Sequence, residues 1–117
     1  MILSSFGAGF RSCNRLKRPE EFKRVFSSKR RSSDNSFLFL AKSNSFDLAR
    51  LGLAIPKKHI HSAVERNKLK RIIRESFRIK QEKLKGNDIV VVVRNKLDVN
   101  QKNIESILAK HWDKVIK

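Results

Sequence analysis

The stretch ERNKLKRIIRESFR, residues 65–78, concentrates side chains that can bind phosphate groups. It holds six cations and two acids, whereas a surface helix usually pairs opposite charges three or four residues apart. Guanidinium forks suit phosphate oxygens and base edges, and an asparagine adds both a donor and an acceptor. The candidate nucleic-acid-binding residues of this stretch are Arg66, Asn67, Lys68, Lys70, Arg71, Arg74 and Arg78.

A helix is the element that can gather these side chains on one side. At about 100° per residue, one sector receives the stripe that we expect to face the core: Leu69, Ile72, Ile73, Ser76 and Phe77. Most of the cations fall opposite or beside this stripe, while Lys68 points to another flank. Glu75 lies within reach of Arg71 and Arg78. A solvated face that neutralises itself therefore stands as the alternative to a face that binds a polyanion.

Two phenylalanines one helical turn apart form a second candidate site. Phe22 and Phe26 are surrounded by cations, Lys17 among them, and aromatic rings beside cations can stack and hold single-stranded nucleotides. Packing in the core is the alternative for this pair, although a ring can line a groove and pack at its base together. Lys57 and Lys58 follow Pro56 at a predicted strand end, where loops commonly carry function, and predict a phosphate contact.

The whole chain shares the positive bias of residues 65–78. Its 117 residues fit one domain, and a formal net charge of +17 predicts a polyanionic partner, with nucleic acid as the default. An anionic membrane surface is the competing partner, but it requires a basic helix with a free apolar face, and the apolar residues here are needed for a core. The lone Cys13 excludes an intramolecular disulfide, which fits a reducing cytoplasm.

The sequence lacks the signatures of a protein active site. It contains no Walker loop and no G-x-S-x-G motif, and its eleven acids are scattered, whereas a protein-only nuclease collects carboxylates around magnesium. His59 and His61 have no acids at metal-ligand spacing. We therefore expect no catalytic residue, no metal site and no cofactor bound by the protein alone. An architectural binder of double-stranded DNA is a poorer alternative, because the Phe residues fall within predicted ordered elements.

Hydrophobic periodicity predicts a mixture of helices and strands. Pro19 marks the start of a short amphipathic helix. Residues 37–43 predict a strand that places Phe37, Phe39 and Ala41 on one face and Leu38 and Leu40 on the other. Residues 48–56 predict a second strand, and we expect the two strands to pair as a hairpin.

The second half of the chain continues this pattern. A long helix is predicted from about Ser62 to Leu84, ended by Gly86 and Asn87. Residues 88–95, DIVVVVRN, show no alternation and predict a strand buried on both faces. A final helix follows within residues 100–117, and a further short strand is expected near Arg30. We expect residues 1–14 to form a flexible N-terminal segment and residues 15–117 a single binding domain.

Residues 65–78 resemble the RNR motif of the bacterial ribonuclease P protein family, which has the form R-N-R-x-K-R followed by Arg and Glu. Lys68 replaces the second arginine of the motif, and the matching residues are Arg66, Asn67, Lys70, Arg71, Arg74 and Glu75. Three further stretches resemble the family in the same order: RLKRPEEFKRVF, RLGLAIPKKHIHSAVERN and DIVVVVR. The resemblance covers roughly residues 15–95. It implies an α/β (α+β) two-layer sandwich of order αβββαβα, with a small mixed sheet and a left-handed βαβ crossover, although the general rule predicts right-handed crossovers.

The resemblance also implies a function. Members are the protein subunit of a ribonucleoprotein whose catalytic RNA, with its Mg²⁺ ions, removes the 5′ leader of precursor tRNA by endonucleolytic hydrolysis; no other protein is required. The RNR-like residues would bind the catalytic RNA. The leader-binding cleft would be lined by Lys17, Phe22, Phe26, Leu40, Lys57 and Lys58. The family often has an aromatic residue where this chain has Leu40, so contact there would be apolar only. A non-enzymatic structural RNA-binding protein, similar to a ribosomal protein, is the alternative function.

Overall fold

The computed structural model describes residues 14–116, which form three helices and four strands. In chain order these are α1 (Pro19–Phe26), β1 (Arg30–Ser33), β2 (Phe37–Ser43), β3 (Arg50–Ala54), α2 (Ala63–Lys80), β4 (Asn87–Val93) and α3 (Ile104–Ile116). The predicted order, including the short strand near Arg30, is confirmed. Residues 1–13, most of the segment predicted to be flexible, lie outside the described residues. Asn14 is buried and its side-chain amide donates to the Ala49 carbonyl oxygen at 2.7 Å.

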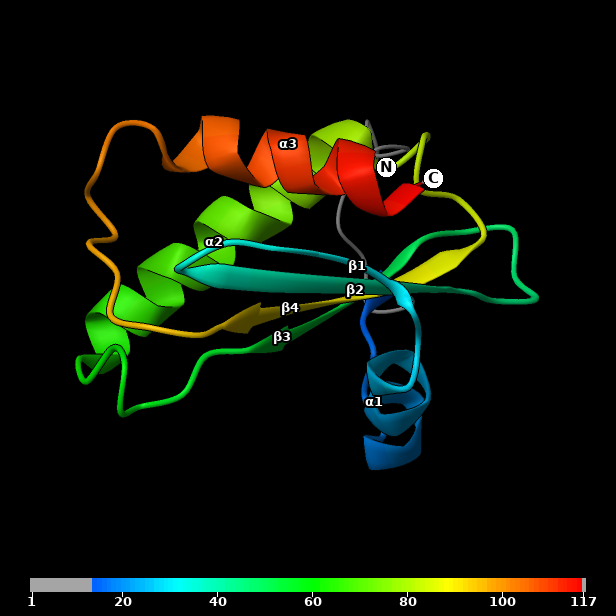
Figure 1. The fold of residues 1–117 in the computed structure, drawn as a ribbon, viewed down its shortest axis with the longest axis horizontal. Coiled ribbons are helices and arrows are strands. Elements are labelled where there is room, and N and C mark those ends of the chain that lie inside the picture. The colour runs from blue at the N-terminus through cyan, green and yellow to red at the C-terminus, as the bar shows by residue number, and fades with distance from the viewer. Residues whose placement is uncertain (1–13, 117) are drawn as a thin grey trace, which may run out of the picture.

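The strands form one mixed sheet in the order β1-β2-β4-β3 (Figure 1). β2 is antiparallel to β1 and β4, whereas β3 is parallel to β4. The predicted hairpin between residues 37–43 and 48–56 is therefore wrong, because β4 lies between these two strands. β4 lies in the centre of the sheet, so both of its edges form hydrogen bonds with neighbouring strands and side chains cover both of its faces. The apolar run IVVVV requires such a buried position. β3, α2 and β4 form the βαβ unit for which the family resemblance implies a left-handed crossover.

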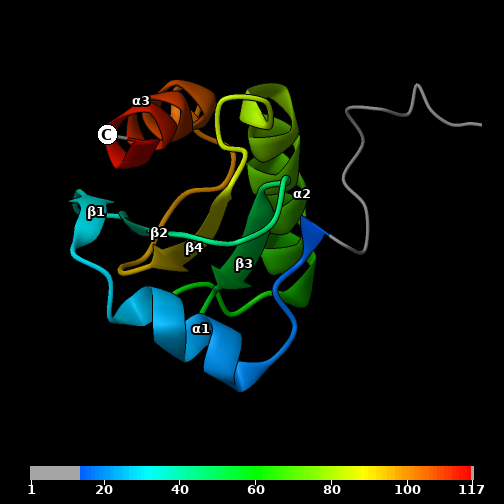
Figure 2. The same cartoon turned by 90° about the vertical axis from the view of Figure 1, so that its right-hand side faces the viewer.

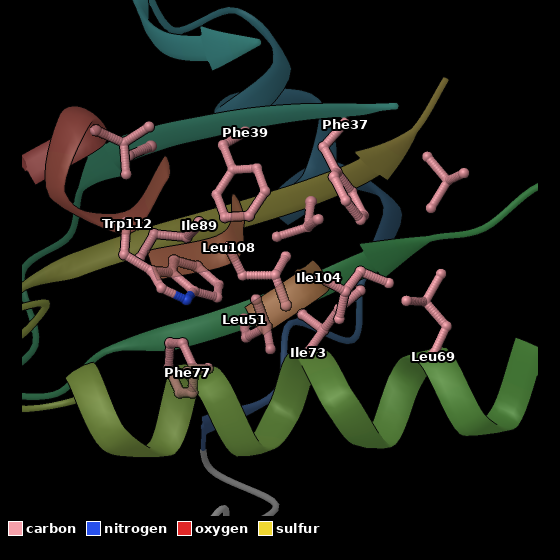
Figure 3. Close-up of a cluster of buried hydrophobic side chains, with 14 of the residues drawn as sticks. Phe37, Phe39, Leu51, Leu69, Ile73, Phe77, Ile89, Ile104, Leu108 and Trp112 are labelled. Atoms are coloured by element: carbon pink, nitrogen blue, oxygen red, sulfur yellow. The ribbon is translucent and has the colours of Figure 1, made fainter. Parts of the chain in front are cut away.

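Helices cover both faces of the sheet, and Figure 2 shows α2 and α3 on one side and α1 on the other. The sheet forms one of the two predicted layers, and α2 and α3 together form the other. The core between these layers contains Phe39, Phe77 and Trp112, whose rings lie edge to face, with centroids 4.7 Å apart for Phe39 and Trp112 (Figure 3). The α1 face holds a smaller cluster that includes Leu40 and Val90. The predicted alternation of residues 37–43 is thus confirmed.

α2 turns its apolar stripe into the larger core. Leu69, Ile73 and Phe77 are fully buried, and Ser76 Oγ accepts a hydrogen bond from Trp112 Nε1 at 2.7 Å. The predicted stripe is confirmed, and the cations are left on the outer side of the helix. Ser62 caps the N-terminus, since its Oγ accepts from the Glu65 backbone N–H at 3.3 Å.

The C-terminus of α2 differs from the prediction. The helix ends at Lys80, four residues before the predicted Leu84, and a series of turns leads to Gly86, whose φ of +80° favours glycine. These turns return the chain to the start of β4. None of the helices within residues 14–116 combines the length and the apolar composition that a membrane span requires.

Candidate nucleic-acid interface

Four polar side chains form an outward-facing set on α2: Asn67, Lys70, Arg71 and Arg74, called the α2 strip below. Asn67 and Arg71 are exposed, while Lys70 and Arg74 are half-buried. Burial, and after it the nearby Arg15 guanidinium, lowers the pKa of Arg74, although an arginine stays charged at neutral pH. A phosphate beside Arg15 and Arg74 would relieve this repulsion. The α2 strip is therefore electrostatically suited to a polyanion.

The other predicted RNA-binding cations of α2 have partners within the chain. Arg66 Nη1 donates to the carbonyl oxygens of Ile60 at 3.0 Å and His61 at 2.7 Å, which fixes the segment before the helix. Lys68 Nζ donates to Asn100 Oδ1. Arg78 forms an ion pair with Glu75, with an Nη2–Oε1 distance of 2.6 Å. Self-neutralisation, the alternative considered from the sequence, thus occurs at Arg78 near the helix C-terminus.

The first ring of the predicted cleft lies against β3. Phe22 covers Gly52 so closely that a Cβ at residue 52 would come within 2.5 Å of Phe22 Cε1 and 2.7 Å of Cζ. The ring, Gly52 and Leu53 line a hollow together with Lys70 and Arg74. The aromatic cleft and the α2 strip therefore share a border. Sequence spacing could not show this, because the three elements that meet here are far apart in the chain.

Gly52→Ala should lower the free energy of unfolding by about 1–3 kcal/mol, because the new methyl group overlaps the Phe22 ring and forces it aside. Denaturant unfolding of both proteins measures the change. The same substitution in a Phe22→Ala background provides the control, since removing the ring should remove most of the cost. An equal cost in both backgrounds would assign the effect to the backbone of β3 instead.

The structure distributes the remaining cleft residues differently. Phe26 is 42% exposed at the end of α1, so this ring is available to a ligand. Lys17, before α1, and Lys57 and Lys58, in the turn after β3, are also exposed. Leu40 is fully buried beneath α1 and presents no surface to a ligand.

Two apolar residues that sequence analysis did not select are closer to the surface than Leu40. Leu38 and Val92 are only partly buried and pack at the margin of the cluster beneath α1. They are cross-strand neighbours on β2 and β4. The alternation of β2 already placed Leu38 on the face of Leu40, so its face was predictable, whereas the depth of each residue was not.

A buried carboxylate fixes α1 against the sheet. Asp88, at the start of β4, accepts hydrogen bonds from Arg50 Nε and Nη2, both at 2.8 Å, and from Arg24 of α1. Arg50 Nη1 also donates to Glu21 Oε2 of α1 at 2.8 Å. We call Asp88, Arg24, Arg50, Glu21 and the adjoining Asn44 the Asp88 network. The network was not predicted from the sequence, although an acid directly before the apolar run IVVVV was a signal.

The pKa of Asp88 is governed by two opposing effects. Burial favours the protonated form and alone would raise the pKa, but hydrogen bonds from Arg50, Asn44 and Arg24 outweigh it and lower the pKa below its ordinary value. The pKa of Glu21 is lowered as well, chiefly by the backbone N–H groups of Arg18 and Lys17. Both acids are therefore ionised at neutral pH and hold α1 by charge.

Clusters of metal ligands are absent from residues 14–116, since no three His, Cys, Asp or Glu side chains gather there. His111 serves the core instead. It lies 2.7 Å from Ser32 Oγ through Nδ1 and 3.0 Å from Asp34 Oδ2 through Nε2, and it stacks on Phe39. This histidine therefore ties α3 to β1 and to the turn that follows it.

Comparison with known proteins identifies the family. The sequence pattern of the family described as Ribonuclease P matches residues 10–116. The chain belongs to the ribonuclease P protein family. The ribonuclease P protein component of Methylococcus capsulatus is 45% identical over 107 residues, which cover 91% of this chain and 84% of that protein. The corresponding protein of Aliivibrio fischeri is 43% identical over 102 residues, or 86% of this chain and 87% of its own length.

Solved structures of ribonuclease P proteins share the fold. The Staphylococcus aureus protein aligns with a TM-score of 0.70 and 27% identity over 88% of this chain and 92% of its own. The Thermotoga maritima protein aligns with a TM-score of 0.65 and 30% identity over 82% and 96%. The expected α+β fold is thus confirmed. The chain is a protein component of ribonuclease P, the tRNA-processing ribonucleoprotein, and the ribosomal-protein-like alternative is not favoured.

Proposed function

We propose that the chain binds the catalytic RNA of ribonuclease P through α2 and the single-stranded 5′ leader of precursor tRNA through the cleft beside α1. The RNA and its Mg²⁺ ions carry out the hydrolysis. The observation that supports this division most directly is the hollow where Phe22 adjoins Lys70 and Arg74. At this position one positively charged protein surface contacts both the catalytic RNA and the leader. It screens the electrostatic repulsion between the two RNAs, which tightens substrate binding. The lone Cys13 supports a cytoplasmic location.

The residues divide between the two RNAs by position. The α2 strip, with Arg66, Lys68 and Arg78 beside it, contacts phosphates of the catalytic RNA. The rings of Phe22 and Phe26 stack on leader bases, and the exposed Lys17, Lys57 and Lys58 contact the leader backbone. Because Leu40 is buried, Leu38 provides the apolar contact that was expected from Leu40.

Cleavage of a precursor tRNA by a bacterial ribonuclease P RNA, with and without this protein, tests the proposal. At low Mg²⁺ concentration the protein should accelerate cleavage strongly, and the cut should fall at the mature 5′ end. The isolated protein, incubated with the same substrate, should cleave nothing. Binding to a verified active RNA without any acceleration would reject the proposal and leave only a basic RNA-binding protein.

Phe26→Leu should weaken binding of precursor tRNA by the assembled particle, because one stacked base contributes about 1–3 kcal/mol. The exposed position of Phe26 means that stability should change by less than about 0.5 kcal/mol. Competitive binding of tRNA precursors with and without the leader measures the effect. Affinity for the leaderless substrate should be unchanged, and an equal loss for both substrates would contradict leader stacking at Phe26.

A further inference from the structure

A second exposed aromatic ring lies in the turn between β2 and β3, outside the sites proposed above. Phe46 is 50% exposed, and the guanidinium of Arg50 lies over the ring, with Arg50 Cζ 4.6 Å from the ring centroid. A cation over one face of an aromatic ring is attracted by the ring electrons. Arg50 therefore contacts one face of the Phe46 ring, while half of the Phe46 surface remains exposed to solvent.

The Asp88 network fixes both partners of this stack. Arg50 is held by its hydrogen bonds to Asp88 and Glu21. Asn44 accepts a hydrogen bond from the Phe46 backbone N–H at 2.9 Å and donates to Asp88 Oδ1 at 2.8 Å. The Phe46 turn is consequently ordered before any ligand arrives, which lowers the entropic cost of binding to it.

The hollow beside this ring is suited to a neutral planar group. It is lined by Arg24, Ser43, Asn44, Ser45, Phe46 and Arg50. Asp88 and Glu21 neutralise the two arginines, so the hollow has no strong excess charge for a phosphate. It offers an aromatic face with the hydroxyl groups of Ser43 and Ser45 around it. These are the contacts that an unstacked nucleobase uses in single-stranded RNA recognition.

Lysines that could bind the phosphates beside such a base come from a neighbouring turn. The Asn44 backbone N–H donates to the Gly86 carbonyl oxygen at 2.8 Å, and the Gly86 N–H donates to the Leu48 carbonyl oxygen at 3.1 Å. These bonds place the turn that carries the exposed Lys83 and Lys85 beside the Phe46 turn. The lysine turn directly follows α2, whose outer face is assigned to the catalytic RNA.

The geometry points to Phe46 as a stacking platform for an unpaired nucleobase of the catalytic RNA, separate from the α2 strip and from the leader cleft. The assignment to the catalytic RNA rests on the proposed function. In that proposal α2 binds the catalytic RNA, and the lysine turn directly follows α2. The contact adds a second anchor at the end of the sheet where β2 ends and β3 begins. Two separated anchors fix the orientation of the protein on the RNA, which one helix alone does not.

Binding of in vitro transcribed bacterial ribonuclease P RNA to Phe46 variants tests this inference. Phe46→Ala and Phe46→Leu should each raise the Kd roughly five- to a hundredfold, the range that one stacked base contributes. Phe46→Trp keeps an aromatic face and should bind within about threefold of the parent. Its added indole emission should be quenched on RNA binding, above the signal of Trp112, which is buried in the parent core.

Ser106→Ala is the control, since Ser106 is an exposed residue of α3, an element to which no RNA contact is assigned. It should leave the Kd within about twofold, as expected for a surface substitution. An unchanged Kd in folded Phe46→Ala and Phe46→Leu, with loss in an α2 strip variant, would overturn the platform but keep the proposed function. Failure of the parent to bind the RNA would instead reject the proposed function. A loss only with precursor tRNA would overturn the assignment to the catalytic RNA.

Discussion

Replacing Lys70, Arg71 and Arg74 together with alanine should weaken binding of the catalytic RNA by on the order of a thousandfold near 0.05 M salt. Each neutralised phosphate changes the slope of log K against log salt by about 0.7–0.9, which corresponds to roughly tenfold per contact at that salt concentration. The slope of the triple variant should therefore be shallower by about two to three. Salt titrations of binding measure affinity and slope together.

Arg66 is left intact in this variant because its guanidinium also donates to the Ile60 and His61 carbonyl oxygens, so its loss would mix folding with binding. The control is a triple alanine variant of three exposed lysines, Lys102 just before α3 and Lys110 and Lys114 within it. This variant loses the same amount of positive charge. It should retain most of the affinity and slope. Equal losses in the two triple variants would show that net charge, and not the α2 strip, determines binding.

Asp88→Ala should lower the free energy of unfolding by about 3–5 kcal/mol, the cost of removing one partner of a buried ion pair. The Asp88 side chain has no exposed surface, and its loss leaves Arg50 and Arg24 without their shared acceptor. Denaturant unfolding measures the change. Asp113→Ala is the control, because Asp113 pairs with Lys80 at 3.3 Å on the surface and should contribute less than about 1 kcal/mol. A similar, small effect of both substitutions would contradict a structural role for the Asp88 network.

The Asp88 network also makes stability depend on pH in one direction. The folded-state pKa values of Asp88 and Glu21 lie below their ordinary values, so the unfolded chain takes up protons first as the pH falls. Their stabilisation is complete above the ordinary carboxyl pKa, near pH 4, and is lost as the pH falls through the lowered folded values. Unfolding free energies between about pH 2 and about pH 7 should decline more gently towards acid in Asp88→Asn than in the parent. Parallel curves would contradict the lowered pKa of Asp88.

The sequence by itself determined which faces of the elements are buried and where positive charge gathers. Leu69, Ile73 and Phe77 recur at helical spacing, and Phe37, Phe39 and Ala41 recur at strand spacing, so local periodicity sets their burial. The same periodicity places the α2 strip outside. The motif around Arg66 and Asn67 also pointed to the ribonuclease P family, because a short motif on one helix depends only on neighbouring residues.

The tertiary structure alone decided which elements meet. A two-residue period fixes the faces of a strand but not its partners, so the separation of β2 and β3 by β4 could not be read from the pattern of either strand. The contact of Phe22 with Gly52, the burial of Leu40 and the pairing of Asp88 with Arg24 depend on distant segments. Such contacts arise when long-range packing closes the core, and no local pattern encodes the residue on the other side.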